Sequence, residues 1–196
     1  MNEMNNLNNL HLYDLYKKSP LESHKWESYF YIYEEIFSEL KGKDITFVEV
    51  GVHNGGSLFM WKEYFGKNSR IVGVDLNPNA KLLEEYGFEI YIGSQNDSDF
   101  WDNFHKEVNG IDILLDDGSH DYYDQILTLN KAVLDLWSKI LQSISLQEAK
   151  RPKRILLVLH SKTRLIWRTN SIQSAWSVLL ENQIVREFLV QWRQQM

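Results

Sequence analysis

The sequence predicts an α/β fold built on a doubly wound, mainly parallel β-sheet. Short apolar runs rich in β-branched residues recur along the chain, at residues 45–50, 71–76, 89–93, 111–117 and 154–160. Such runs are typical of strands that are buried on both faces of a parallel sheet. Segments with apolar residues at helical spacing separate them, so strand and helix alternate. In sheets of this kind, ligands bind beyond the carboxyl ends of the strands.

Two elements are predicted before the first strand. Residues 1–18 are polar and rich in asparagine, which favours a flexible N-terminal arm. From Pro20 to Leu40, aromatic and aliphatic residues recur every three or four positions, which predicts an amphipathic helix. Gly42 follows at a position suited to ending that helix.

Helices are predicted after each of the first four strands. They cover residues 57–65, 82–87, 98–108 and 123–141, and the last is the longest. A fifth strand, at residues 154–160, then extends the sheet. The polar residues that follow each strand are therefore expected to meet at one edge of the sheet.

Composition excludes several classes of protein. The 196 residues suit one domain with a sizeable core, and the absence of cysteine excludes disulfides and thiolate metal sites. No apolar run reaches the ~20 residues that span a bilayer, and the N-terminus lacks the pattern of a secretory signal. A net charge of −6 disfavours nucleic acid as a partner. These features predict a cytoplasmic protein without a membrane or nucleic-acid partner, and they leave a homo-oligomer open.

The C-terminal segment differs in charge from the rest of the chain. Residues 1–150 carry 13 Lys and Arg against 25 Asp and Glu, a balance of −12, whereas residues 151–196 carry 8 against 2, a balance of +6. Arginine replaces lysine as the main cation there, and glycine is absent after Gly118. We therefore expect an α/β domain over residues 19–141 and an atypical C-terminal segment over residues 142–196.

A glycine-rich turn follows the first predicted strand. Glu49, Gly51 and Gly55 stand in the pattern acid–x–Gly–x–x–x–Gly, and His53 occupies the place of the second glycine of a dinucleotide fingerprint. Asp75 ends the second strand, where an acid commonly binds the hydroxyls of a ribose. The pattern favours an adenosine ligand with a cationic amino-acid moiety, and the alternative is a turn without a ligand.

Polar residues also follow the third and fourth strands. Gln95 is a candidate donor to an adenine edge, although an ordinary polar loop has the same composition. Asp116, Asp117 and His120 lie within five residues of one another. Carboxylate oxygens suit Mg²⁺ or Ca²⁺, and an imidazole accepts a proton near neutral pH. The alternative is that these residues are helix-capping acids beside an exposed histidine.

Four segments together resemble the class I S-adenosylmethionine-dependent methyltransferases, which have a Rossmann-like sheet. They are VEVGVHNGGSLFMWKEYF, IVGVDLNP, YIGSQNDSDF and ILLDDGSHDYYDQ. Within that class, they look most like the metal-dependent sugar O-methyltransferases of macrolide biosynthesis, a group that includes cephalosporin-hydroxylase-like proteins. The resemblance covers about residues 25–140 and implies methyl transfer to a hydroxyl of a sugar or glycosylated metabolite.

The resemblance also implies roles for single residues. Glu49, Gly51 and Gly55 would border the methionine part of S-adenosylmethionine, and Asp75 would bind its ribose. Gln95 and Asp116, at the ends of the third and fourth strands, are also predicted to bind the cofactor, independently of the resemblance. Asp117 would be a ligand of Mg²⁺, and His120 would be the base that deprotonates the acceptor hydroxyl.

The chain departs from this family after the fourth-strand helix. Such enzymes carry a Gly-Gly turn and a Glu-Asp pair there, whereas this chain has Leu157 and Val158 at about the place of the acids. The sheet is therefore expected to end differently from that of the family. Two alternatives stay open. One is a nucleotide-dependent oxidoreductase or hydroxylase, with His53 as a second histidine; the other is a methyltransferase fold that binds a cofactor or partner without turnover.

Overall fold

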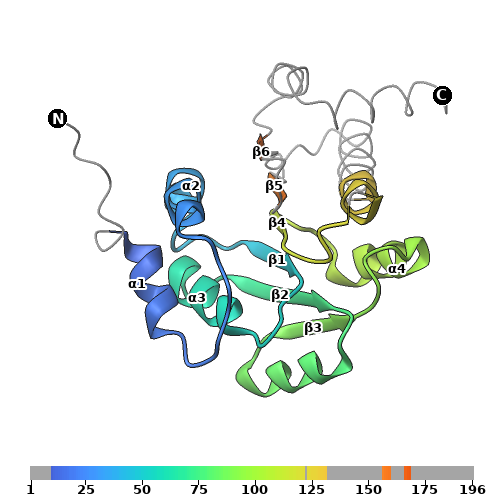
Figure 1. Ribbon diagram of the computed structural model, residues 1–196, viewed down its shortest axis with the longest axis horizontal. Coiled ribbons are helices and arrows are strands. Elements are labelled where there is room, and N and C mark those ends of the chain that lie inside the picture. Colours follow the sequence, from blue (N-terminus) through green and yellow to red (C-terminus); the bar gives the residue numbers. More distant parts are fainter. Residues whose placement is uncertain (1–9, 122, 132–155, 160–165, 169–196) are drawn as a thin grey trace. The chain divides into compact units, whose positions relative to one another are not determined.

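The computed structural model describes residues 10–121, 123–131, 156–159 and 166–168 of the chain (Figure 1). The chain divides into two compact units, residues 1–92 and residues 93–196. This division falls inside the single domain that the sequence predicts over residues 19–141. Each unit is described by itself below.

The first unit contains three parallel strands. They are β1 (Thr46–Val50), β2 (Arg70–Asp75) and β3 (Glu89–Ile92), and β2 pairs with both of the others. Val48 lies opposite Val72 in the first pair, and Val74 lies opposite Tyr91 in the second. Because all three strands run the same way, their carboxyl ends lie at one edge, where the predicted cofactor residues follow.

Helices connect and flank these strands. α3 (Gly56–Phe65) follows β1, and the 3₁₀ segment η3 (Pro78–Tyr86) follows β2. α2 (Glu27–Phe37) and the short 3₁₀ turn η2 (Ser38–Leu40) precede β1. The sequence predicts the start of this helix at Pro20, but the structure begins it seven residues later, after Trp26 in an extended conformation. Residues 19–25 lie instead over the turn after β1, through the contacts of Ser19 and Lys25.

The sequence predicts a flexible arm over residues 1–18, and this prediction is wrong for residues 11–18, which form the helix α1 (His11–Lys18). Leu12 is fully buried, and its backbone N–H donates to Glu34 Oε1 at 2.7 Å. α1 packs against α2 and α3, as Figure 1 also shows. The asparagine-rich start masked this amphipathic segment, and residues 1–9 lie outside the described part.

Aromatic side chains fill the core of the first unit. The ring of Trp61 lies 4.8 Å from that of Phe47, 5.6 Å from that of Phe37 and 5.7 Å from that of Phe65, measured between centroids. Edge-to-face and offset pairs at these distances stabilise a core beyond the area they bury. This cluster fixes α2 and α3 against β1, and thereby fixes the turn between β1 and α3.

The second unit contains α4 (Ser98–Val108), the strands β4 (Ile113–Asp116), β5 (Leu156–Leu159) and β6 (Ile166–Arg168), and helical residues 123–131. β4 pairs with β5 in parallel, as predicted, and β5 pairs with β6 antiparallel. No pattern in the sequence predicts β6. The predicted helix over residues 123–141 is confirmed to residue 131, and its remainder lies outside the described part.

The predicted fold class is confirmed: the strands are mainly parallel and alternate with helices. In the part of the chain that the structure describes, no helix is both long enough and apolar enough to cross a membrane.

Candidate functional site

The turn after β1 has the backbone conformation that its glycines predict. Gly51 and Gly55 have φ angles of 80° and 85°, in the left-handed region that favours glycine. The N–H of Gly51 donates to Val74 O at 2.8 Å, and the N–H of Gly55 donates to Val52 O at 2.8 Å. The chain therefore leaves β1 and enters α3 through a tightly hydrogen-bonded turn.

Asp75 ties this turn to the end of β2. Its Oδ2 accepts hydrogen bonds from the backbone N–H groups of Val52 at 3.0 Å and His53 at 3.1 Å. Its Oδ1 accepts a third from the N–H of Asn77 at 2.8 Å. The carboxylate of Asp75 is thus held at the strand edge by two loops that are far apart in sequence.

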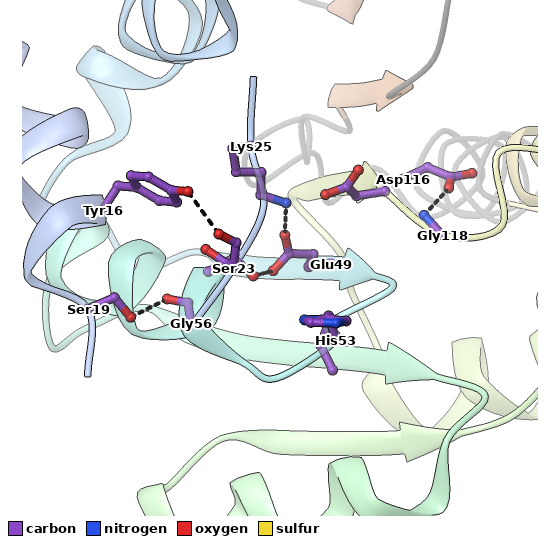
Figure 2. Close-up of polar contacts among 12 residues, drawn as sticks. Tyr16, Ser19, Ser23, Lys25, Glu49, His53, Gly56, Asp116 and Gly118 are labelled. Carbon is purple, nitrogen blue, oxygen red and sulfur yellow. Dashed lines mark hydrogen bonds and ion pairs between the residues drawn. The ribbon is translucent and has the colours of Figure 1, made fainter. Parts of the chain in front are cut away.

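Glu49 is buried and ionically paired. Lys25 Nζ lies 2.7 Å from Glu49 Oε1, and the side chains of the two residues are 2% and 0% exposed. The hydroxyl of Ser57, in the first turn of α3, donates to Glu49 Oε2 at 2.6 Å. Figure 2 shows the Lys25 side chain pointing at Glu49. Sequence reasoning missed Lys25, because the segment around it was predicted as helix.

The segment that carries Lys25 lies over the turn. Ser19 Oγ donates to Gly56 O at 2.8 Å, and Tyr16 Oη donates to Ser23 O at 2.8 Å (Figure 2). A Cβ on Gly56 would lie 2.2 Å from Leu21 O, so no side chain fits there. Residues 19–25, called the strap below, therefore depend on glycine at position 56.

In the second unit, Asp116 is buried at the end of β4 and bound to Gln95. Gln95 Nε2 donates to Asp116 Oδ2 at 2.7 Å, and the N–H of Gly118 donates to Asp116 Oδ1 at 3.2 Å. Burial raises the pKa of Asp116 to about 6, and the hydrogen bonds from Gly118 and Gln95 oppose that rise. Asp116 therefore keeps its proton to a higher pH than an exposed aspartate does.

Asp117 and His120 face one another more loosely. His120 Nε2 lies 4.0 Å from Asp117 Oδ1, and the two side chains are 54% and 13% exposed. His120 has a φ of 59°, which is uncommon for a residue other than glycine. The acid that caps the following helix is Asp121, whose Oδ1 accepts from the N–H of Tyr123 at 2.8 Å. The capping alternative therefore applies to Asp121, while Asp117 and His120 stay outside the helix.

The described residues do not by themselves form a complete magnesium site. Nowhere in the described ranges do three or more His, Cys, Asp or Glu side chains group so that they could hold a metal ion. In β5, which pairs with β4, Leu157 and Val158 lie opposite Leu114 and Leu115, so neither position offers an oxygen ligand from its side chain. Asp117 as a magnesium ligand stays a prediction.

No family model matches the chain. Over 102 residues it is 35% identical to 8-demethyl-8-(2-methoxy-alpha-L-rhamnosyl)-tetracenomycin-C 3'-O-methyltransferase of Streptomyces olivaceus, covering 48% of this chain and 26% of that protein. Over 95 residues it is 32% identical to mycinamicin VI 2''-O-methyltransferase of Micromonospora griseorubida, covering 45% and 23%. The chain thus matches about a quarter of the length of these relatives.

Among solved structures, the chain resembles the MycE methyltransferase of mycinamycin biosynthesis, solved in complex with Mg, SAH and mycinamycin VI. The TM-score is 0.59 at 22% identity, with 75% of this chain and 36% of MycE covered. The fold is that of a class I methyltransferase. The resemblance to sugar O-methyltransferases that the sequence indicates is also confirmed.

Within this methyltransferase fold, the predicted residues fall into two groups. Glu49, Gly51, Gly55 and Asp75 lie together at the strand edge of the first unit. Gln95, Asp116, Asp117 and His120 lie together in the second. Their roles toward a cofactor or substrate stay predictions. In the first group, Glu49 also contacts Lys25 and Ser57, which no sequence motif predicted as part of the site.

Proposed function

We propose that this chain binds S-adenosylmethionine and transfers its methyl group to a hydroxyl of a sugar or glycosylated metabolite. The observation that carries the proposal is the similarity of 35% and 32% to two sugar O-methyltransferases, on a chain with the methyltransferase fold. Because the chain covers about a quarter of those relatives, its activity, acceptor and partners are part of the proposal.

The strand edge of the first unit is the proposed cofactor site. A carboxylate has about four acceptor positions, and Asp75 uses three of them on backbone N–H groups. One position is thus left for a ribose hydroxyl. Glu49, whose charge is paired with that of Lys25, lies near the turn where the amino-acid part of the cofactor would lie, and the glycines let the backbone approach it. Asp116 is the other residue proposed at this cofactor, whereas the amide of Gln95 is already bonded to Asp116, Thr128 and Ser119.

His120 is the proposed base. The sulfonium of S-adenosylmethionine already makes the methyl carbon electrophilic, so the protein has to align the acceptor oxygen and remove its proton. As the new carbon–oxygen bond forms and the carbon–sulfur bond breaks, the hydroxyl proton passes to the imidazole. The Asp117 carboxylate, 4.0 Å from Nε2, offers an opposite charge to the imidazolium that results.

Magnesium is part of the proposal, with Asp117 as its ligand. The structure of MycE with Mg and SAH supports magnesium as the ion, whereas Asp117 as its ligand rests on the sequence alone. A bound magnesium ion would supply Lewis acidity that lowers the pKa of the acceptor hydroxyl. Since the described residues do not complete such a site, the proton transfer above uses only His120.

A second candidate function is binding without turnover. The apolar Leu157 and Val158 in β5 favour it, because the family carries acids at about this place. The cytoplasmic location, the absence of membrane and nucleic-acid partners, and the oligomeric state likewise stay predictions.

Calorimetry with S-adenosylhomocysteine and with NAD tests the proposal. We expect S-adenosylhomocysteine to bind and Asp75→Ala to weaken binding by about 1–3 kcal/mol, through loss of charge-assisted hydrogen bonds. Binding of NAD without binding of S-adenosylhomocysteine would refute the cofactor. Transfer of labelled methyl to glycosylated macrolide acceptors then separates the two candidates: cofactor binding with no transfer to any acceptor favours binding without turnover.

A further inference from the structure

The side-chain amide of Gln95 connects several parts of the second unit. It is buried, with 8% exposure, in the loop that precedes α4. Its Nε2 donates to Asp116 Oδ2 at 2.7 Å and to Thr128 Oγ1 at 3.0 Å. Its Oε1 accepts from the N–H of Ser119 at 2.9 Å. One amide thus joins β4, the loop after it and helical residues 123–131.

The neighbours of this amide determine its orientation. Asp116 is a carboxylate and accepts hydrogen bonds, whereas the backbone N–H of Ser119 only donates. The Thr128 hydroxyl donates to Asp124 O at 3.0 Å, so its lone pair faces Gln95. If the amide were flipped, oxygen would face the carboxylate and N–H would face N–H. Both amide hydrogens and the oxygen are therefore used inside this unit.

The loop held by these bonds is the one that carries the proposed base. Gly118 and Ser119 are bound through Asp116 and Gln95, and they immediately precede His120. His120 itself is in the left-handed backbone region, which non-glycine residues adopt only when surrounding contacts require it. The backbone of Gln95 is also fixed, because Trp101 Nε1 donates to its carbonyl oxygen at 2.9 Å.

We propose that Gln95 is a positioning residue, which holds the loop at residues 117–121 in the conformation that presents Asp117 and His120. This role replaces the adenine contact predicted from the sequence, since the amide has no hydrogen left to offer a base. The inference rests on the proposed function of His120, but the hydrogen bonds of Gln95 to Asp116, Thr128 and Ser119 are present whatever reaction the chain performs.

Hydrogen exchange followed by mass spectrometry tests whether Gln95 holds the loop at residues 117–121. Calorimetry tests the alternative, in which Gln95 contacts the adenine of the cofactor. We expect Gln95→Met to speed exchange in a peptide covering residues 117–121 by about tenfold or more, with the turn at residues 51–57 unchanged. Its affinity for S-adenosylhomocysteine should stay within about twofold of the wild type, whereas loss of an adenine hydrogen bond would weaken it about tenfold. Where an acceptor is methylated, kcat should fall while KM for the cofactor is kept.

A reversed pair provides the matched control. Gln95→Glu places two carboxylates together, so it should release the loop and speed its exchange. Q95E/D116N places the amide at position 116 as donor opposite the carboxylate at position 95 as acceptor, so it should recover slow exchange. The side-chain carbonyl at position 116 still accepts from Gly118 in that double variant. The proposal is overturned if Q95M leaves loop exchange unchanged, if it abolishes cofactor binding, or if Q95E/D116N exchanges as fast as Q95E. If Q95M does not fold, the Q95E comparison decides; if the wild type binds no cofactor, only the proposed function fails.

Discussion

Lys25 and Glu49 form a buried ion pair between the strap and the end of β1, with Nζ and Oε1 2.7 Å apart. Moving both charges out of water costs several kcal/mol per ion, and their attraction offsets this cost only with further hydrogen bonds. Ser57 supplies one such bond to Glu49. The pair therefore fixes the position of the strap more than it adds to stability.

Removing one partner of this pair should destabilise the fold strongly. Lys25→Met leaves Glu49 buried without its cation, so we expect the free energy of unfolding in urea to fall by about 3–5 kcal/mol. Lys81→Met is the matched control, because its ion pair with Glu84 is 52% and 45% exposed. An exposed pair contributes about 0–1 kcal/mol. Equal stability of the two variants would contradict the burial of the Lys25 pair.

Gly56→Ala should separate the strap from the turn. Alanine is normally the better helix former, yet here its Cβ would lie 2.2 Å from Leu21 O and 2.7 Å from Glu22 O. Backbone atoms do not yield easily, so we expect a loss of about 1–3 kcal/mol and faster trypsin cleavage after Lys25.

Gly87→Asn provides the contrast to that variant. Gly87 has a φ of 85° and no atom within 4 Å of an added Cβ, so the only constraint there is conformational. Asparagine tolerates the left-handed region, and this variant should lose well under 1 kcal/mol. Trypsin resistance of Gly56→Ala equal to that of Gly87→Asn would show that the strap does not press on the turn.

Asp116 should make stability fall as pH rises. Its pKa is raised from 3.8 to about 6 in the folded chain, so the folded state holds its proton more tightly than the unfolded state does. Its contribution is therefore greatest below the unfolded value and is lost between about pH 4 and pH 6. The two pKa values correspond to about 3 kcal/mol.

Asp116→Asn isolates this contribution, since asparagine does not titrate and its Oδ1 can still accept from Gly118. The difference in unfolding free energy between wild type and variant should change across that pH window and stay constant above it. Parallel curves from pH 4 to pH 7 would mean that Asp116 is not shielded from water.

The strands and their polar ends were predictable because parallel strands need continuous apolar runs and the acids interrupt those runs abruptly. Glu49 and Asp75 were found in this way. The role of Lys25 was not predictable, because the segment between Pro20 and the aromatic helix has the composition of an ordinary exposed segment. Only the tertiary contact with Glu49 buries this lysine. Asp116 could not be told from Asp117 either: the two acids are adjacent in the sequence at the end of β4, and only the hydrogen bond from Gln95 shows that Asp116 is the enclosed one.

Methyl transfer should depend on magnesium, which is expected to bind only weakly. The described residues supply Asp117 but no group of three metal ligands, so any activity is expected to need a high concentration of Mg²⁺. The measurement is transfer of labelled methyl against Mg²⁺ concentration, with Asp117→Ala beside the wild type. Full activity in the presence of a chelator would remove magnesium from the proposed reaction.

His120→Ala should lower the rate of methyl transfer by at least about 10²-fold, the usual contribution of a positioned base. Because the side chain of His120 is 54% exposed, stability and affinity for S-adenosylhomocysteine should change little in this variant. His11→Ala is the control, since His11 is exposed on α1 and stacks on Tyr64 with ring centroids 6.1 Å apart. Its rate should match the wild type. A normal rate in His120→Ala would assign the proton to another group.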